Sequence, residues 1–282
     1  MKSIYKYIVC VCTALAATSC DFLDVVPDNV ATEEHAFADR YTVEKYLASC
    51  YWRVPKAASM SENPGIHGAM EMILNTEYSG DTGMKLGLGQ DSPTSALMNY
   101  WASSYSLYAG IRDCNTFMMG IGDVKDLDEY EKKRMIAEVK MLKAYFHFYL
   151  LSYYGPICPL RESPAVNEST QAVRVYREKV DDCFSYVLDL MDEVIESEAL
   201  PLILSNPTTE LGRFTQPAAY MLKAKILLYW ASPLFNGNTD YNSFRDHNGE
   251  PFYNQTYDAS RWTTAAEASK KAVDIWDTPR IR

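Results

Sequence analysis

The sequence contains no long uncharged apolar segment. A helix needs about 20 largely apolar residues to cross the hydrocarbon core of a bilayer. The longest candidate, YIVCVCTALAA at residues 7–17, is too short, and it follows two lysines, Lys2 and Lys6. A basic start followed by a short apolar run is typical of a cleaved export signal. We therefore predict no membrane-spanning helix and interpret residues 1–19 as a signal peptide.

Positive charge is also scarce. The chain has 27 Lys and Arg against 37 Asp and Glu, which gives a net charge of −10 at pH 7. Removal of residues 1–19 takes away two lysines and no acidic residue, so the net charge becomes −12. Phosphate backbones and anionic lipid headgroups require a net positive surface. This balance argues against nucleic acid and anionic lipid headgroups as partners, but it leaves neutral ligands such as sugars open.

Catalytic and metal signatures are missing. The sequence has no G-x-S-x-G turn, no H-E-x-x-H helix and no glycine-rich phosphate loop, and nothing indicates the facing carboxyl pair of a glycosidase. His147 lies in the apolar run YFHFY and is interpreted as a core histidine. Residues 236–242, NGNTDYN, alternate oxygen ligands as a calcium loop does, but Tyr241 and His247 replace its essential Gly and Glu. We predict no enzyme, no metal and no cofactor.

The cysteines form no C-x-x-C pair and have no neighbouring histidine. Once the signal peptide is removed and Cys20 is set aside, four remain: Cys50, Cys114, Cys158 and Cys183. Three of them stand among apolar residues with helical spacing. We interpret them as small buried hydrophobic residues, with disulfides as the alternative in an exported protein.

The stretch ATSC at 17–20 resembles a bacterial lipobox, in which cleavage before the cysteine leaves it to be acylated. Ala17 and Ser19 stand where Leu and Gly or Ala are usual. Each buried acyl methylene contributes about 0.8 kcal/mol to membrane attachment. We predict a lipid (palmitate-type) anchor on Cys20 followed by a tether over residues 20–40. The alternative is a secreted protein with an unmodified Cys20.

Runs of alternating β-branched residues are nearly absent, whereas apolar residues recur with a helical period. Pro and Gly near the ends of these runs support their limits. The predicted class is all-α, with helices at 43–53, 93–119, 129–153, 171–197, 215–231 and 261–275.

An internal repeat refines this prediction. The letters MLKA occur at 141–144 and again at 221–224, and each copy precedes a turn, a polar loop and a second amphipathic helix. Small Ala144 and Ala224 would let helices approach closely. Repeated helix pairs of this kind are typical of tetratricopeptide-like stacks. Residues 129–197 and 215–276 are each predicted to form an antiparallel pair, with the two alanines at equivalent contacts.

Four stretches can be compared with known families: CDFLDVVPD at 20–28, LYAGIRDCNTFM at 107–118, IAEVKMLKAYFHFYLLSYYGPICPL at 136–160 and RFTQPAAYMLKAKILLYWASPLFNG at 213–237. Together they resemble the SusD/RagB family, surface lipoproteins of Bacteroidetes that capture nutrients, mostly glycans. The resemblance implies a tetratricopeptide-like scaffold that sits as a lid over a SusC-type TonB-dependent transporter. Asp21 and Asp24 are similar to the surface-export signal of such lipoproteins, which implies a location at the outer membrane and cell surface.

The resemblance covers only the N-terminal part of such proteins. The family normally continues into a loop-rich second half that supplies much of the ligand site. We therefore expect residues 41–282 to be an N-terminal helical domain from a fragment or truncated frame, and to bind glycan weakly on its own.

The chain is rich in aromatic residues, with 21 Tyr, 10 Phe and 5 Trp. Flat rings can stack on the apolar face of a pyranose, and binding residues are common in loops on rigid scaffolds. The candidates therefore lie in the loops at 76–93 and 236–257. They are Tyr78, Asp81, Tyr241 and Asn242. Aromatics inside helices are expected to be core: Tyr145, Phe146, Phe148, Tyr229 and Trp230. Trp101 is expected to open a helix and to pack in the core.

Two functions follow from this reading. The leading one is a non-catalytic glycan-binding lipoprotein that works with a SusC-type transporter in oligosaccharide uptake. The alternative is a structural lid or docking scaffold on the transporter for a peptide or other non-glycan nutrient, in which the loops are solvated insertions or transporter contacts.

Overall fold

The computed structural model describes residues 33–56, 82–92, 94–103, 106–164, 168–171 and 173–277. Within these ranges the chain is helical and has no strand, only the isolated bridges Ser92–Ser95 and Arg245–Pro251, which confirms the all-α prediction. No helix in this part of the chain is long and apolar enough to cross a bilayer. Cys20, Tyr78 and Asp81 lie outside the described residues.

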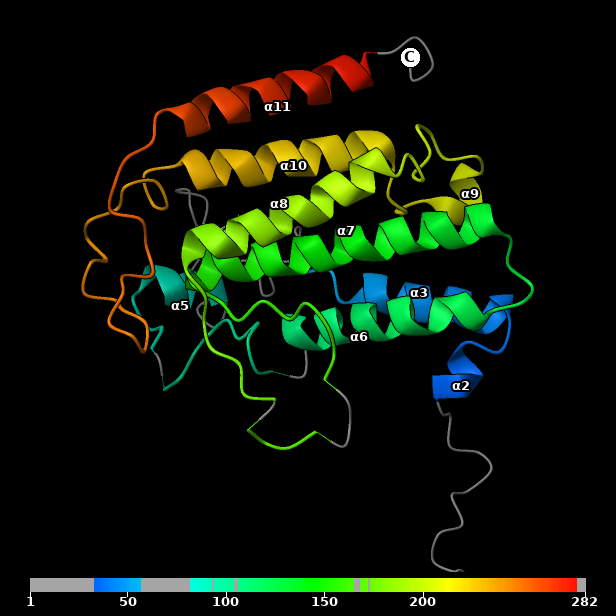
Figure 1. Ribbon diagram of the computed structural model, residues 1–282, viewed down its shortest axis with the longest axis horizontal. Coiled ribbons are helices and arrows are strands. Elements are labelled where there is room, and N and C mark those ends of the chain that lie inside the picture. The colour runs from blue at the N-terminus through cyan, green and yellow to red at the C-terminus, as the bar shows by residue number, and fades with distance from the viewer. Residues whose placement is uncertain are drawn as a thin grey trace, which may run out of the picture.

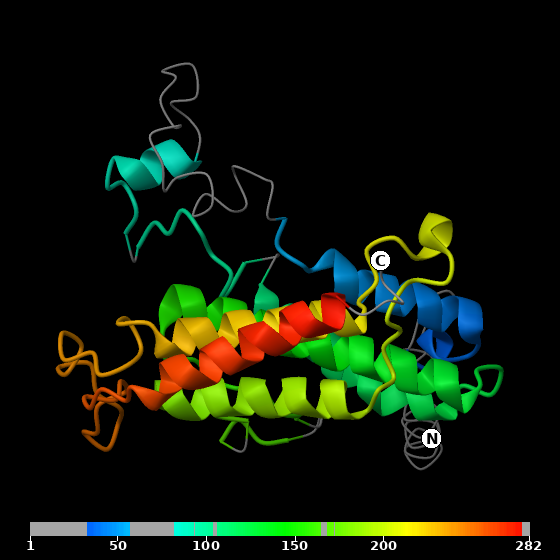
Figure 2. The same cartoon turned by 90° about the horizontal axis from the view of Figure 1, so that it is seen from above.

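The longer helices form the bundle in Figure 1, and short ones flank it. The longer ones are α3 (Arg40–Trp52), α6 (Leu107–Gly120), α7 (Glu129–Tyr154), α8 (Val180–Glu196), α10 (Gln216–Ala231) and α11 (Ser260–Trp276). The short ones are α2 (Glu33–Ala36), α5 (Thr82–Gly87), the 3-10 turn η3 (Ile121–Asp123) and α9 (Pro207–Glu210). In the turned view of Figure 2, α5 lies away from the packed helices.

Local sequence signals define where α7 begins and ends. The Asp128 carboxylate accepts a hydrogen bond from the Glu131 amide at 2.8 Å, and the Glu131 side chain accepts one from the Asp128 amide. This reciprocal capping satisfies backbone donors that the first turn leaves open. At the other end the chain leaves the helix at Gly155, whose φ of +69° lies in the left-handed region that favours glycine.

Successive long helices run in opposite directions along the bundle (Figure 1). Helix α7 packs on α8, and α10 packs on α11, so residues 129–197 and 215–276 each form the predicted antiparallel pair. Helix α8 also contacts α10, while α6 and α3 cover the other flank of α7. Ala144 is fully buried and Ala224 is only 8% exposed, as a close helix contact requires. The fold is therefore a tetratricopeptide-like helical stack.

The predicted helix at 93–119 is wrong in its first half, because α6 begins only at Leu107 and residues 94–103 form turns and bends. The Leu107 amide donates to the Tyr100 carbonyl at 2.8 Å, which folds the segment back on the helix start. Trp101 therefore opens no helix. Its ring packs edge-on against Tyr108 and Tyr154, at 5.0 and 5.5 Å between centroids, so the expected core packing is confirmed.

The predicted helix at 171–197 also starts late. Residues 174–179 are irregular, and α8 begins at Val180. The Glu178 amide donates to the Ile157 carbonyl at 2.8 Å, and the Val180 amide donates to the Phe252 carbonyl at 2.9 Å. These long-range bonds replace the local helical ones. Residues 174–179 have helical spacing in the sequence, but in the structure they form part of a loop.

Most of the predicted core residues are buried. His147 is fully buried, and its ring nitrogens contact the Lys143 carbonyl at 2.8 Å and the Leu160 amide at 3.2 Å, which confirms a satisfied core histidine. Phe146 and Phe148 are buried, and Tyr145 and Trp230 pack against the core. Tyr229 departs from the prediction, because it is 39% exposed although its ring edge contacts Phe148.

The four described cysteines carry free thiols in this structure. Cys50, Cys114 and Cys183 are buried among apolar side chains, as predicted, and Cys158 is partly buried.

Candidate functional site

Three loop segments meet at one end of the bundle, at the left of Figure 1. They are residues 94–103, 156–164 with 168–179 (residue 172 not described), and 232–259, and we refer to them together as the loop end. They gather there because α6, α8 and α11 begin at this end while α7 and α10 finish at it. The up-and-down stack therefore brings together loops that are far apart in the sequence.

Arg177 joins these segments. Its guanidinium lies 4.7 Å from the Trp101 ring centroid and 5.8 Å from that of Phe244. Each contact is a favourable cation–π geometry. A second link is the stacking of Tyr176 on His247, at 4.6 Å between centroids. Tyr176 and Arg177, just before α8, thus contact both the 94–103 segment and the 232–259 segment.

A ladder of aromatic rings leads from the core to the surface of the loop end. Phe184 on α8 meets Phe235 edge-on at 5.0 Å, Phe235 lies parallel to Tyr253 at 6.3 Å, and Tyr253 stacks on Tyr241 at 4.9 Å with 19° between planes. We name these four residues the aromatic ladder. Phe184 is fully buried, whereas Tyr241 is 43% exposed. The predicted ligand residue Tyr241 is therefore an exposed ring held in place by a ring beneath it.

Tyr253, the supporting ring, is a residue that sequence reasoning missed. It is buried, and burial raises its pKa, with the neighbouring Tyr241 hydroxyl adding to the rise. It remains a neutral phenol over the physiological range and presents a flat, uncharged surface to Tyr241. Nothing in its local sequence distinguished it from the other tyrosines of this loop.

Asn242, the other predicted ligand residue that the structure describes, acts within the loop. Its carbonyl oxygen accepts a hydrogen bond from Arg245 at 2.9 Å, and Arg245 also donates to the Gly249 carbonyl at 2.7 Å. The structure brings Asn242 to the loop end beside Tyr241, but its side-chain oxygen is engaged in holding the loop.

Other asparagines of this loop also bond to the backbone. The Asn236 side chain donates to the Asp258 carbonyl and accepts from the Asp258 amide, both at 2.8 Å, and it is 3% exposed. Asn238 donates to the Leu234 carbonyl at 2.9 Å. The Asn236 bonds join the two ends of the loop, and the Asn238 bond is local, so these polar side chains are engaged within the loop. Among the described residues no group of three or more His, Cys, Asp or Glu could hold a metal ion.

Further exposed aromatics surround the aromatic ladder. Tyr176 is 52% exposed, Phe244 37% and Tyr257 59%. Phe244 and Tyr257 belong to the loop that the sequence singled out, whereas Tyr176 was assigned to a helix and so was passed over. The loop end thus carries a group of half-exposed rings on a framework of hydrogen bonds.

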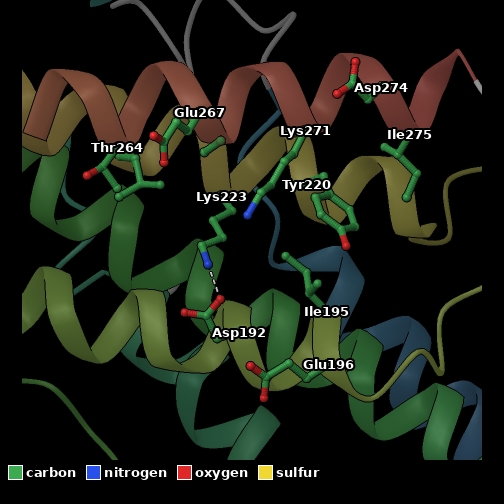
Figure 3. Close-up of a pocket in the computed structure, with 12 residues that line it drawn as sticks. Asp192, Ile195, Glu196, Tyr220, Lys223, Thr264, Glu267, Lys271, Asp274 and Ile275 are labelled. Carbon is green, nitrogen blue, oxygen red and sulfur yellow. Dashed lines mark hydrogen bonds and ion pairs between the residues drawn. The ribbon is translucent and has the colours of Figure 1, made fainter.

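None of three cavities in the described part of the chain is lined by a residue of the aromatic ladder. The largest described one, about 480 Å³, is a groove between α8, α10 and α11 that is lined by both charge signs, including the Lys223–Asp192 ion pair (Figure 3). One of about 400 Å³ lies between α3 and residues 209–213, and one of about 240 Å³ adjoins residues 52–56 and 97–100. Neither Tyr241 nor Asn242 lines any of these three. The candidate site is therefore centred on the exposed Tyr241 ring, outside these three cavities.

Comparison with known families identifies the fold. Residues 21–228 match the profile of a SusD-like family described as "Starch-binding associating with outer membrane". Because this match covers most of the chain, the protein belongs to the SusD-like family. A search of curated proteins gave no match.

Solved structures agree with this assignment. The chain is similar to the protein BT4246, with 25% identity and a TM-score of 0.72 over 86% of this chain and 40% of that one. A laminarin-binding SusD-like protein matches with 20% identity and a TM-score of 0.56, over 69% of this chain and 41% of that one. Surface glycan-binding protein A from Bacteroides thetaiotaomicron, solved with laminarihexaose, matches with 15% identity and a TM-score of 0.55, over 86% and 44%. The chain thus spans about two fifths of the length of these structures.

Proposed function

We propose that this protein binds glycans without turning them over, at the outer surface of a bacterial cell. The observation that carries the proposal is the exposed ring of Tyr241, stacked on Tyr253 at the loop end of a SusD-like helical scaffold. A pyranose presents an apolar face of C–H groups, and a fixed, half-exposed tyrosine ring matches such a face. Two similar proteins, a laminarin-binding SusD-like protein and a surface glycan-binding protein solved with laminarihexaose, support the same class of ligand.

The negative net charge of the chain is consistent with a neutral glycan as ligand. A neutral oligosaccharide is not repelled by a chain of net charge −10, whereas an anionic polymer is. The loop end offers several separate exposed rings, so contacts with an extended chain of sugars would add along its length. With one ring stacked per sugar, we expect dissociation constants in the millimolar range for short oligosaccharides.

The proposed context is uptake. The protein would be anchored through acylated Cys20 at the outer membrane, facing outward, and would hand oligosaccharides to a SusC-type TonB-dependent transporter. The family description, which includes association with the outer membrane, supports this location. The alternative is a structural lid or docking scaffold on the transporter whose cargo is a peptide or another non-glycan nutrient.

The glycan proposal is tested by titration of the purified chain with a panel of glucan oligosaccharides, followed by NMR or calorimetry. Tyr241→Ala should weaken binding about five- to tenfold, since loss of one stacking contact costs roughly 1 kcal/mol and every 1.4 kcal/mol is tenfold. The matched control is Tyr130→Ala. This tyrosine is 61% exposed on the first turn of α7, at the far end of the bundle. Equal effects of the two substitutions would reject the loop end as the site, and no binding by the wild type would favour the alternative function.

The anchor is tested by fractionation of cells that produce the protein. Cys20→Ala should release the protein from membranes or leave its signal uncut. A wild-type protein that is soluble and has a free Cys20 thiol would contradict the anchor and leave the glycan proposal standing.

A further inference from the structure

Cys50 and Cys114 face each other inside the bundle. Cys50 lies on α3 and Cys114 on α6, and both are 0% exposed. The two helices run antiparallel and pack against each other (Figure 1). Cys50 and Cys114 are 64 positions apart in the sequence, so only the fold brings the two cysteines together.

Gly110 on α6 lies against the residue that ends α3. A Cβ atom placed on Gly110 would lie 3.2 Å from the Cβ of Arg53. Arg53 is also tied to α6 by an ion pair with Asp113, at 3.2 Å between Nε and Oδ2. A side chain at residue 110 would meet both the Phe146 ring, at 2.9 Å, and Arg53, so glycine leaves room for the end of α3 on α6.

The register of the pair places the two cysteines on facing sides. Cys50 precedes Arg53 by three residues and Cys114 follows Gly110 by four, and residues three or four apart lie on the same face of a helix. On the other side of the cysteines, Tyr46 of α3 meets Phe117 of α6 at 6.1 Å between ring centroids. The cysteine pair therefore lies between two direct contacts of α3 with α6.

The two thiols interact with each other. Burial raises the pKa of Cys114, and the next cause of the rise is a hydrogen-bonding contact with the Cys50 side chain. Both thiols are fully buried, so reagents outside the folded protein do not reach them. A bond between them would form while the chain folds and would then be protected.

We propose that Cys50 and Cys114 are joined by a disulfide between α3 and α6 in the exported protein. A disulfide needs Cβ atoms about 3.5–4.5 Å apart, and the contacts of Arg53 with Asp113 and of Tyr46 with Phe117, on either side of the pair, favour such an approach. The oxidant is a disulfide-carrying thiol oxidase of the cell envelope. One cysteine thiolate attacks its disulfide to give a mixed disulfide, and the second thiolate displaces the oxidase, which leaves as a dithiol with the two electrons and two protons. This step rests on the export of the chain, which is part of the proposed function.

The remaining cysteines serve as internal controls. The Cys183 thiol donates to the carbonyls of Ile157 and Glu178, at 3.8 and 3.7 Å, and Cys158 is only partly buried. Both remain reduced in this proposal.

The first experiment maps the thiols. The full chain, exported in a bacterial host, is denatured without reductant, alkylated and digested for mass spectrometry. We expect a cross-linked peptide pair holding Cys50 and Cys114, with Cys158 and Cys183 alkylated. Alkylation of all four cysteines, or a cross-link between any other pair, would overturn the proposal.

The second experiment separates a bond from mere packing. Reductant should lower the melting temperature of the exported wild type by roughly 5–15 °C, because the bond restrains a long loop in the unfolded chain. The double variant Cys50→Ser with Cys114→Ser should melt at one temperature with or without reductant, whereas Cys158→Ser should keep the full shift. An unchanged wild-type melting temperature in reductant would refute the bond.

A third arm separates this inference from the proposed function. The reduced, unfolded chain is refolded in a glutathione redox buffer and mapped in the same way. Absence of the bond in this buffer refutes the helix geometry itself. If the Cys50–Cys114 bond forms in the buffer but not in the exported protein, oxidation in the cell is refuted and support for export is lost. The glycan titration does not depend on this result.

Discussion

The strongest stability prediction concerns Glu138, a fully buried carboxylate in the middle of the fold. It accepts hydrogen bonds from the Tyr51 hydroxyl at 2.8 Å, from Arg134 at 3.2 Å and from two nitrogens of Arg213 at 2.8 and 3.1 Å. These partners come from α3, from α7 and from the segment before α10. One buried carboxylate thus fastens three parts of the chain that are distant in sequence.

Glu138→Ala removes the acceptor and leaves two guanidinium groups and a hydroxyl around an empty space. Breaking a buried ion pair by removing one partner costs about 3–5 kcal/mol, because the remaining charge is left uncompensated. Glu210 still pairs with Arg134 at 2.7 Å, so the lower part of this range is the expected result. The glutamate of an exposed pair is the contrast. Glu193 is 54% exposed, lies 2.5 Å from Lys140, and its removal should cost less than about 1 kcal/mol.

The assay is urea denaturation of the wild type, Glu138→Ala and Glu193→Ala, monitored by helical circular dichroism. With a slope of about 2–3 kcal/mol per molar urea, Glu138→Ala should lower the unfolding midpoint by roughly 1–2 M and Glu193→Ala by less than half a molar. If the two variants unfold at the same midpoint with equal slopes, the buried network does not hold the bundle together in the way described here.

Two further predictions concern packing and pH. Ala224→Leu should destabilise the protein by about 1–3 kcal/mol through overpacking, because Ala224 is buried. Met221→Leu, at an exposed position of α10, should change stability by less than about 0.5 kcal/mol, and equal urea midpoints would contradict this. Burial lowers the pKa of His147 to about 3. Its ordinary value near 6.5 applies to the unfolded chain, which therefore binds a proton first as the pH falls. Stability should drop by roughly 2 kcal/mol from this group between pH 7 and pH 5, and His147→Gln should show a flatter pH profile.

Much of the helical framework is encoded locally and could be predicted. The ends of α7 follow from Asp128 with Glu131 and from Gly155, since caps and left-handed glycines act within one or two turns. The repeat of MLKA correctly predicted two antiparallel pairs, because each copy carries its own apolar face. The choice of the 236–257 loop and of Tyr241 came from composition alone, and the structure does place that ring at the surface.

Other features depended on contacts between distant residues. The late starts of α6 and α8 result from hydrogen bonds to Tyr100, Ile157 and Phe252, which no local pattern contains. The gathering of three loops around Arg177, the stack of Tyr241 on Tyr253, and the meeting of Cys50 with Cys114 arise only when antiparallel helices bring their ends and faces together. Helical periodicity specifies which side of a helix is apolar, but the packing of the whole bundle selects the helix that covers that side. Tertiary structure therefore decided where the candidate site lies.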